Sequence, residues 1–440
     1  MNFEESLAYL LSLGHETLAM KLGLRNTEKL LDKLDNPQQS YPSVQIAGTN
    51  GKGSTAVVLD SICLSAGVRS GLFTSPHLVS ITERIVIGGR EISQNDFARY
   101  AATVRTAADD LVGQGELETL PTFFEHVTAI ALLAFRDAGV KLAILETGLG
   151  GRLDATTVAE ADIVAITPLA LDHQEYLGET IAEIASEKAA IIRPGTTAII
   201  APQPAPALDV ILQRCHETGV TPILVDQQRA AIRDATPDGR FRVTFETRAG
   251  RYENVQLGLR GRHQVLNTAV ALQIAESLRD RGFDIPDAAI IHGIESSKHA
   301  GRLELLGGAP SFLLDGAHNP SGAQALRGYL EEFFTGPITL IFGAMKEKKL
   351  REIATILFPL ADELIITRPD NPRSAGVDEL LQLAREFAAG EKIVATSSVS
   401  EAFEKAPQVT PANGLICVTG SLYLLGEIKA IIERRIEYKL

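Results

Sequence analysis

Short runs of consecutive apolar residues alternate with amphipathic stretches along most of this chain. Three of these runs cover residues 44–47, 142–145 and 163–166. Apolar residues at consecutive rather than alternate positions are typical of a parallel strand that is covered on both faces. The segments 123–137 and 180–192 have the helical period. The pattern therefore predicts an α/β fold in which helices cover both faces of a parallel sheet.

The alternation is interrupted between residues 240 and 260. Two β-rich runs, Phe241–Phe245 and Glu253–Leu257, flank the polar segment Arg248–Arg251, which predicts an antiparallel hairpin. A helix is expected over 267–279. The strand–helix alternation then restarts, with strands predicted at 312–314, 338–342, 364–366 and 415–418. We expect two domains, residues 1–297 with a parallel sheet plus a small antiparallel sheet, and residues 298–440 forming a smaller Rossmann-like α/β domain.

Composition narrows the function classes. The net charge is −13, with 55 acidic and 42 basic residues, which argues against a general nucleic-acid or membrane-surface binder. The 3 cysteines are far apart, so we expect neither a disulfide framework nor a zinc site. The acidic start differs from a signal peptide, and no apolar run approaches the roughly 20 residues that span a bilayer. We expect a cytoplasmic protein.

The strongest local motif is the glycine-rich segment Gly48–Thr55, which follows a predicted strand and precedes a helical run. Backbone N–H groups of such a loop turn toward phosphate oxygens, and the helix N-terminus adds a partial positive charge. Lys52 supplies a point charge for the β- and γ-phosphates, and Ser54 or Thr55 supplies a hydroxyl for Mg²⁺. Because Gly53 separates Lys52 from Ser54, the spacing differs from the usual P-loop. The alternative is an ordinary glycine-rich turn.

Polar side chains follow several of the predicted strands. Glu146 and His173 come just after two of them, and Ser75 precedes a proline that holds it extended. Carboxyl ends of parallel strands open into the crevice where such sheets bind ligands. Oxygen ligands with an occasional imidazole suit Mg²⁺. The alternatives are a structural histidine, a plain proline turn and, for Lys188 on the following helix, a solvated helix face.

The segment Asp315–Pro320 places Asp, His and Asn at a strand-to-helix turn of the second domain. These residue types suit ligand contact, and they equally suit capping of the next helix. The residues alone leave this choice open.

Taken together, these segments resemble the folylpolyglutamate synthase/dihydrofolate synthase enzymes of the Mur ligase family. The resemblance spans about residue 20 to residue 425. The matching segments are 48–54, 75–78, 83–85, 122–125, 146–154, 171–173 with 177–178, 187–188, 263–264 with Asn267, 301–302 with Glu304, 315–320 and 419–423.

The resemblance implies roles for individual residues, which we take as expectations. Residues 1–297 become an ATP-binding, P-loop ATPase-like domain, and 298–440 a glutamate ligase domain. Catalytic roles fall to Lys52, His318 and Lys188, with His318 near the γ-phosphate and the incoming amine. The implied ATP-binding residues are Thr49, Asn50, Gly51, Lys52, Gly53, Ser54, Asn267, Arg302 and Asp315. The implied pterin-binding residues are Met20, Lys21, Leu22, Thr122, Phe123, Phe124, Glu125, Leu153, Asp154 and Ala155. The implied metal ligands are Ser54, Ser75, Glu146, His173 and Lys188 as a carbamate.

The activity that the resemblance implies is ATP-dependent addition of L-glutamate to dihydropteroate and to reduced folate (poly)glutamates through an acyl-phosphate. Mg²⁺ and ATP are the expected cofactor and co-substrate, and a monomer with small-molecule substrates is expected. Phe123 and Phe124 have an alternative as core residues at a helix start. Thr157, Lys21 and the run 343–348 depart from the usual residues of the family.

Three other functions remain open from the sequence. A Mur-type peptidoglycan ligase shares the chemistry, but the segment 122–125 and the position of the phosphate loop at residue 48 disfavour it. A P-loop kinase or NTPase has no evident need for the segment 315–320. A non-catalytic nucleotide-binding protein is the third alternative.

Overall fold

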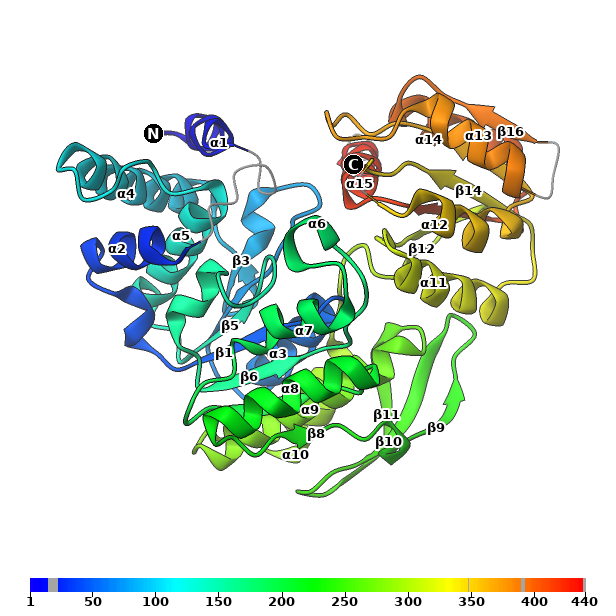
Figure 1. Cartoon of the computed structure of the whole chain (residues 1–440). Helices are drawn as coiled ribbons and strands as arrows, with labels where there is room; N and C mark the ends of the chain where they lie inside the picture. The colour runs from blue at the N-terminus through cyan, green and yellow to red at the C-terminus, as the bar shows by residue number, and fades with distance from the viewer. Residues whose placement is uncertain (15–22, 347, 389–391, 438–440) are drawn as a thin grey trace.

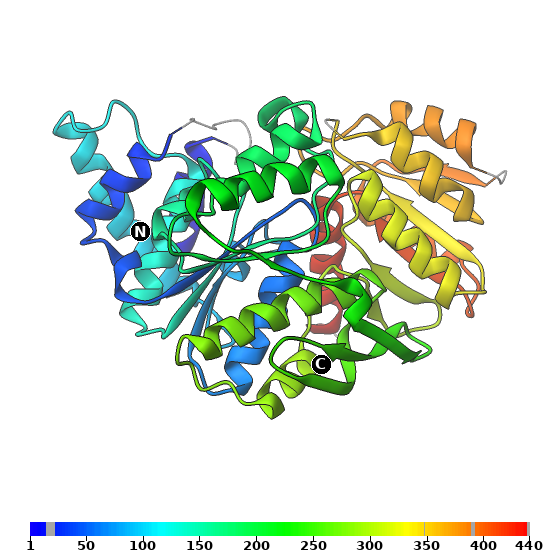
Figure 2. The same ribbon diagram turned by 60° about the horizontal axis from the view of Figure 1, so that its bottom comes forward.

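The computed structural model describes residues 1–14, 23–346, 348–388 and 392–437. Within these residues the strands form three sheets. Two of them organise separate parts of the chain, which lie side by side in Figures 1 and 2. We call these the N-terminal part, which holds the first two sheets, and the C-terminal part, which holds the third.

The largest sheet has the strand order β4-β3-β2-β5-β1-β6-β7-β8. The strands from β2 to β8 in this order pair in parallel, whereas β3 and β4 pair antiparallel at one edge. Their bounds are β1 Ser43–Ala47, β2 Ser70–Phe73, β3 Ile85–Ile87, β4 Arg90–Glu91, β5 Leu142–Glu146, β6 Ile163–Ile166, β7 Thr197–Ile200 and β8 Ile223–Leu224. The predicted parallel sheet is confirmed.

Both faces of this sheet are covered, which explains its continuous apolar runs. In β5, Leu142 and Ile144 face one cluster, whereas Ala143 and Leu145 face another. The helices on the first face are α3 Lys52–Ser65, α9 His263–Asp280 and α10 Asp287–Ser296. Those on the opposite face are α1 Phe3–Ser12, α2 Arg25–Lys33, α4 Gln94–Gly113, α5 Phe123–Asp137, α7 Ile181–Ala189 and α8 Ala205–Thr218. Shorter helices are η1 Pro37–Ser40, η2 Ile81–Arg84, η3 Ala155–Ala159, α6 Gln174–Leu177 and η4 Gln227–Arg229.

The predicted hairpin is formed by β10 Arg240–Glu246 and β11 Arg251–Arg260. A further strand that the sequence did not predict, β9 Ala230–Ala235, pairs with β10. Most of β9 is exposed, so its residues lack the apolar alternation that marks a half-buried strand.

The C-terminal part is built on a sheet with the order β12-β13-β17-β14-β15-β16, in which β12 runs antiparallel to β13. The bounds are β12 Glu304–Leu306, β13 Ser311–Leu314, β14 Ile338–Phe342, β15 Glu363–Ile366, β16 Ile393–Ala395 and β17 Leu415–Thr419. One face packs on α11 Pro320–Phe333, α12 Leu350–Leu357, η5 Phe358–Leu360 and α13 Val377–Phe387, and the other on α14 Val399–Val409 and α15 Leu422–Glu437. The expected smaller α/β unit is confirmed. The boundary between residues 297 and 298 lies between α10 and β12 and stays a prediction.

The two parts make close contacts at sites far apart in the sequence. The Tyr329 hydroxyl on α11 donates a hydrogen bond of 2.9 Å to the carbonyl of Asp238 in the turn between β9 and β10. On the other side, α15 packs against the loop after β2. A Cβ atom on Gly426 would lie 2.0 Å from the Leu78 carbonyl oxygen, so glycine is required for this approach.

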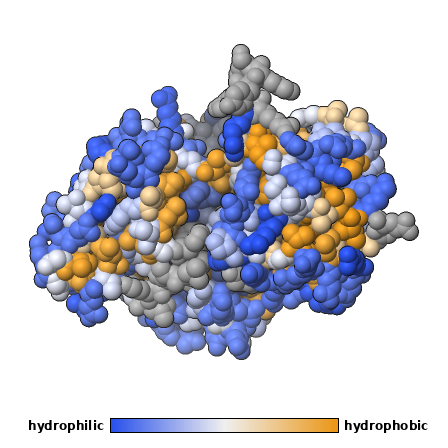
Figure 3. Space-filling model, turned by 90° about the horizontal axis from the view of Figure 1, so that it is seen from above, coloured by the Kyte–Doolittle hydropathy of each residue, from blue (hydrophilic) through white to orange (hydrophobic). Residues whose placement is uncertain are grey.

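The surface is mixed in character. On the face shown in Figure 3, hydrophilic residues surround apolar patches on both parts. None of the helices in the described ranges combines the length and the apolar character needed to cross a bilayer.

Candidate functional site

A strand, a glycine loop and a helix start build the floor of the site. The loop joins β1 to α3, whose first residue is Lys52, and Gly51 at its N-cap has a φ of 90°. A Cβ on Gly48 would lie 1.8 Å from Thr167 Oγ1, and one on Gly51 would lie 2.2 Å from Asn267 Oδ1. Glycine at both positions lets the loop backbone pass close to its neighbours. The N–H groups at the start of α3 then form an anion site.

Side chains of this loop are held both by the loop itself and by distant segments. Lys52 Nζ donates to the carbonyl oxygens of Gly48 and Thr49 at 3.2 and 3.4 Å. Ser54 Oγ accepts a hydrogen bond of 3.2 Å from Gln264 Nε2 and lies 3.1 Å from His299 Nδ1. The loop therefore holds a cation and a hydroxyl in fixed positions.

Glu146 and Ser75 meet at the ends of neighbouring strands. The Ser75 backbone N–H donates to Glu146 Oε2 at 3.1 Å, and Glu146 is 5% exposed. Burial raises the pKa of this carboxyl, while the nearby Lys52 charge opposes the rise. A buried carboxylate beside a lysine of the phosphate loop fits a cation-dependent phosphate site.

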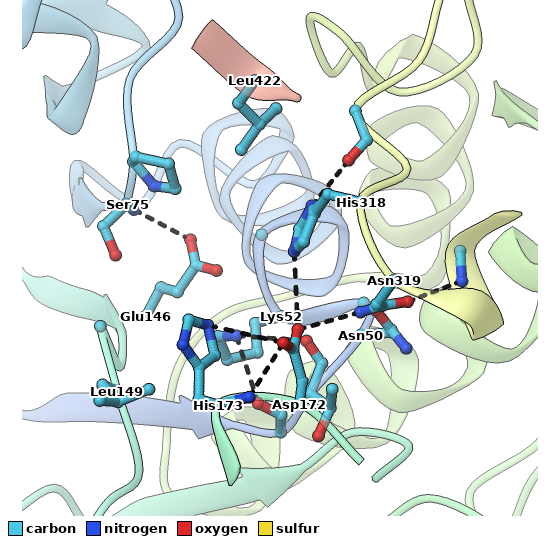
Figure 4. A pocket seen from close by; sticks show the side chains of 18 of the residues that line it. Asn50, Lys52, Ser75, Glu146, Leu149, Asp172, His173, His318, Asn319 and Leu422 are labelled. Carbon is cyan, nitrogen blue, oxygen red and sulfur yellow. Dashed lines mark hydrogen bonds and ion pairs between the residues drawn. The ribbon is translucent and has the colours of Figure 1, made fainter. Parts of the chain in front are cut away.

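His173 follows β6 and lies on the same side of the pocket as Glu146 and Lys52 (Figure 4). Its backbone is left-handed, with a φ of 51°. Burial and the charge of Lys348 lower the pKa of His173 to about 3, so the ring is neutral and has a lone pair for a cation. In the described ranges, no three His, Cys, Asp or Glu side chains gather as a metal-binding group. The ligand set of Ser54, Ser75, Glu146, His173 and Lys188 stays a prediction.

Lys188 is buried beneath the loop rather than solvated on a helix face, with 4% of the residue exposed. Its Nζ donates a hydrogen bond of 2.9 Å to the Gly48 carbonyl. Burial, together with the Lys52 charge, lowers the pKa of Lys188 to about 7. A large share of this amine is therefore neutral at neutral pH, which is the form that reacts with CO₂.

The C-terminal part contributes the opposite wall. Arg302 Nη1 donates to the Gly316 carbonyl at 3.3 Å, and His318 Nδ1 donates to the same oxygen at 2.8 Å. The buried Asp315 carboxylate accepts hydrogen bonds from the Leu303 and Ala317 N–H groups. Burial raises the pKa of Asp315, and the Arg302 charge opposes this.

Asn319 confirms the capping alternative for this turn and also contacts the N-terminal part, whereas ligand contact by the segment Asp315–Pro320 stays a prediction. Its Oδ1 accepts from the Gly322 N–H at 2.8 Å and caps α11. Its Nδ2 donates across the cleft to Asn50 Oδ1 at 3.0 Å and to Asp172 Oδ2 at 3.1 Å.

Sequence reasoning missed several residues of this site. Lys348 Nζ donates to Asp172 Oδ1 at 2.8 Å, and neither residue was predicted as functional. Burial raises the pKa of Asp172, but the His318 contact and the Lys348 charge outweigh it and hold the pKa below its usual range. The available signals were the position of Asp172 next to His173 after a strand, and the unusual run 343–348.

Several residues of the predicted pterin segments already make hydrogen bonds or core contacts within the protein. Thr122 and Glu125 form a capping box at the start of α5, and Glu125 Oε1 accepts from the Thr27 hydroxyl at 3.0 Å. Phe123 packs in the core, whereas Phe124 lines the pocket. A Cβ on Gly148 would lie 2.5 Å from Phe124 Cζ, so Gly148 leaves room for the ring.

The Asp154 carboxylate also accepts hydrogen bonds from within the protein. Its Oδ2 accepts from the Leu149 N–H at 2.9 Å, and its Oδ1 accepts from the N–H and hydroxyl of Thr156. Leu153 and Ala155 line the pocket beside it. Thr157 donates its hydroxyl to the Gly151 carbonyl at 2.7 Å. Met20, Lys21 and Leu22 lie outside the described residues.

One cavity of about 610 Å³ joins these groups. Apart from Phe123, every predicted site residue within the described ranges lines it. These are Thr49, Asn50, Gly51, Lys52, Gly53, Ser54, Ser75, Thr122, Phe124, Glu125, Glu146, Leu153, Asp154, Ala155, His173, Lys188, Asn267, Arg302, Asp315 and His318.

Comparison with known proteins points to one kind of enzyme. The model of the Mur ligase middle domain matches residues 46–275, and that of the Mur ligase glutamate ligase domain matches residues 301–422. The probable bifunctional folylpolyglutamate synthase/dihydropteroate synthase of Halobacterium salinarum is 35% identical over 98% of this chain and 51% of that protein, so the chain spans about half the length of that relative. The dihydrofolate synthase/folylpolyglutamate synthase of Mycobacterium tuberculosis is 34% identical over 93% of this chain and 90% of that protein. The solved structure of the Mycobacterium tuberculosis folylpolyglutamate synthase complexed with ADP superposes with a TM-score of 0.89 at 31% identity, covering 97% of this chain and 98% of that chain.

Proposed function

Since the chain belongs to the Mur ligase family, we propose that it is an ATP-dependent ligase that adds L-glutamate to dihydropteroate and to reduced folate (poly)glutamates. The observation that carries this proposal is the single cavity. The phosphate loop, the polar side chains of Arg302, Asp315 and His318, and the apolar side chains of Phe124 and Leu153 all line it. The loop supports binding of a nucleotide, and the apolar surface supports binding of a pterin acid in the same cavity.

The first step activates the acid. A carboxylate is a poor electrophile toward an amine, so one of its oxygens attacks the γ-phosphorus of ATP, ADP leaves and an acyl-phosphate forms. The loop N–H groups bind phosphate oxygens, and Lys52, released from its carbonyl contacts, neutralises charge on the transferring group. Arg302, on the opposite wall, adds a second positive charge.

The second step forms the amide. The neutral amino nitrogen of glutamate attacks the acyl carbon, the bond from this carbon to the phosphate oxygen breaks, phosphate leaves with the electron pair, and the nitrogen releases one proton to solvent or to the departing phosphate. His318 lies at the wall that faces the phosphate loop, where the amine has to enter. The cavity is formed between the two parts of the chain, and this limits the access of water to the acyl-phosphate.

The residues fit a magnesium ion. Glu146 is a buried carboxylate at the pocket, and the neutral His173 ring lies beside it. We propose that these two, with Ser54 and Ser75, hold Mg²⁺, which would neutralise charge on the phosphates. Ser54 Oγ and the Ser75 backbone already contact other groups of the site.

We also propose that Lys188 is carbamylated. Its neutral Nζ attacks the carbon of CO₂, an N–C bond forms, a proton is released, and an anion results. The remaining N–H of the carbamate still donates to the Gly48 carbonyl, which matches the present contact of 2.9 Å. The test is a ¹³C NMR spectrum in ¹³C-bicarbonate. A carbamate signal that disappears in Lys188→Met is expected, and a spectrum without one contradicts the proposal.

That one active site accepts both dihydropteroate and a reduced folate is a separate proposal. Dihydropteroate is shorter than a folate by one glutamate, so its pterin ring has to bind closer to the phosphate loop. Phe124, with its ring at the cavity wall, is placed for stacking on a pterin. Leu153 and Ala155 supply apolar contact beside it.

The deciding experiment supplies ATP, Mg²⁺ and L-glutamate with each acid separately, and follows ADP release and product mass. We expect ADP release to require both an acid and the amino acid. Turnover without either substrate would indicate an NTPase instead. Product from the folate but none from dihydropteroate would leave a polyglutamate synthase alone.

The cellular setting is also proposed. Cys63, Cys215 and Cys417 are free and buried, which supports the cytoplasm as the compartment. A monomer acting on small molecules remains our proposal for the assembly.

A further inference from the structure

We propose that Asp172 is a positioning residue for the ligase reaction, and that it aligns Lys348 and His318 of the C-terminal part over the phosphate loop. The predicted effect on turnover rests on the proposed function, whereas the alignment itself rests on the contacts of Asp172. Asp172 belongs to the N-terminal part, after β6. Its carboxylate accepts a hydrogen bond of 3.0 Å from the neighbouring His173 N–H and also contacts Lys348, Asn319 and His318 of the other part.

The Asp172 carboxylate uses both oxygens across the cleft (Figure 4). Oδ1 accepts a hydrogen bond of 2.8 Å from Lys348 Nζ. Oδ2 accepts one of 3.1 Å from Asn319 Nδ2 and lies 3.7 Å from His318 Nε2. The side chain of Asp172 is 10% exposed and that of Lys348 is 14% exposed. The ion pair is therefore shielded from solvent, unlike an ordinary surface pair.

Asn319 links the carboxylate to the phosphate loop. The same Nδ2 that donates to Asp172 also donates to Asn50 Oδ1 at 3.0 Å. Because Asn319 caps α11 through its Oδ1, its amide is fixed in orientation. Asn319 consequently fixes the start of α11 relative to the phosphate loop and to Asp172.

The arrangement fixes both ends of the His318 ring. Nδ1 donates to the Gly316 carbonyl at 2.8 Å, which leaves Nε2 facing Asp172. Without the carboxylate, the Lys348 ammonium would be left partly buried without its partner, and it would turn toward solvent. His318 would keep its Nδ1 hydrogen bond to Gly316 and lose the carboxylate that lies 3.7 Å from its Nε2.

The docking of the two parts has other supports, so Asp172 is not needed merely to hold them together. Arg262 and Glu332 form a two-pronged ion pair with both contacts at 2.7 Å. Tyr329 binds the turn at Asp238. These contacts lie on α11 away from its first turn. What Asp172 adds is alignment at the point where the γ-phosphate, the acid and the amine have to meet.

The test compares Asp172→Asn, Lys348→Met and the double variant with the full-length wild type. We expect each single variant to lower kcat on the order of 10²-fold, because small misplacements of reacting groups have effects of this size. The KM for ATP should change by less than about threefold, because most phosphate contacts come from the loop. Because the two side chains act as one unit, the double variant should be no slower than the slower single variant. Glu332→Gln is the matched control, since Glu332 pairs with Arg262 across the same two parts and does not itself line the cavity, and it should keep wild-type kcat.

A kcat for folded Asp172→Asn within about threefold of wild type would overturn the proposal. So would losses that multiply in the double variant. If Asp172→Asn does not fold, Lys348→Met decides the question by the same criteria. Hydrogen–deuterium exchange at the first turn of α11 gives a readout without turnover. Faster exchange in the variants than in Glu332→Gln is expected, and unchanged exchange refutes the alignment even if the wild type proves to have a different activity. Absence of ligase product from the wild type would count against the proposed function alone.

Discussion

The two ends of the cavity use their polar residues in different ways. At the phosphate end, Lys52, Glu146 and His173 face the pocket. At the pterin end, Glu125 and Asp154 face it too, but their oxygens already accept hydrogen bonds from Thr122, Thr27, Leu149 and Thr156. Lys52 and Glu146 also make hydrogen bonds within the protein, but only with the backbone of Gly48, Thr49 and Ser75. A polar residue in a pocket is weaker evidence for ligand binding when the fold already uses most of its hydrogen-bonding capacity.

The difference predicts where substitutions act. At the phosphate end they should change turnover and leave folding intact. At the pterin end, those at polar residues should change stability, and those at the apolar wall should change the affinity for the acid.

The largest effect is expected for Glu146→Ala. Removing a charged group that acts on the transferring phosphoryl group should lower ligase turnover on the order of 10³-fold, by analogy with loss of one preorganised electrostatic contact. The melting temperature should not fall, because burial disfavours the carboxylate that is removed. Steady-state kinetics at limiting Mg²⁺ and a thermal melt check both parts. Turnover close to wild type in a folded variant would remove Glu146 from the metal site.

The adjacent phenylalanines sharpen the comparison within the pterin end. Phe123→Ala should lower the free energy of unfolding by roughly 3 kcal/mol, since it empties a core position. Phe124→Ala should raise the KM for the pterin acid by about tenfold, through loss of a stacking surface, and leave the KM for ATP unchanged. Denaturant melts and initial rates with each acid measure the two outcomes. Equal KM effects from both variants would contradict the assignment of Phe124 to the wall.

Glu125→Gln tests whether the polar residues of the pterin end are structural. The capping box at α5 should weaken, and the free energy of unfolding should fall by about 1 kcal/mol. The KM for either acid should stay within about twofold of wild type, a difference below 0.5 kcal/mol. A marked rise in KM without loss of stability would instead give Glu125 a direct contact with the pterin.

Two histidines, His126 on α5 and His263 at the start of α9, should make stability depend on pH. Burial lowers the pKa of His263 to about 4 and also lowers that of His126 below its usual range. Below about pH 6.5 the unfolded chain binds protons that the folded chain does not, so stability falls as the pH decreases, by up to about 1.4 kcal/mol per pH unit for each group. For His263 the loss should level off below about pH 4, where the folded state is protonated too. Chemical denaturation between pH 4 and 7 should show a shallower slope in His263→Gln, and an unchanged slope would contradict the assignment.

The fold was predictable for elements whose burial requires a recognisable pattern of apolar residues in the sequence. The strand at 142–145 and the helix at 123–137 lie where the apolar pattern placed them. The strand β9 was missed because an exposed edge strand needs few apolar residues. The beginning of α9 at His263, four residues before the predicted start, has no side-chain cap to mark it.

The site was predictable as far as single segments carry chemistry. The Gly48–Thr55 loop could be assigned from glycines, a lysine and hydroxyls in one short run. The burial of Lys188 could not, because nothing in its neighbours along the helix shows that it lies under Gly48. Asp172 and Lys348 are 176 residues apart, and only the folded chain brings them together.

The close approach of Gly426 to Leu78 means that α15 can occupy its present position only with glycine at residue 426. With 2.0 Å between the missing Cβ and a carbonyl oxygen, one methyl group acts as a wedge between the two parts. The loop that contains Leu78 also contains Ser75, so a methyl group at residue 426 should displace Ser75 at the predicted metal site. Gly426, near the start of α15, therefore sets how closely the two parts approach, and its replacement by alanine should separate them at this contact.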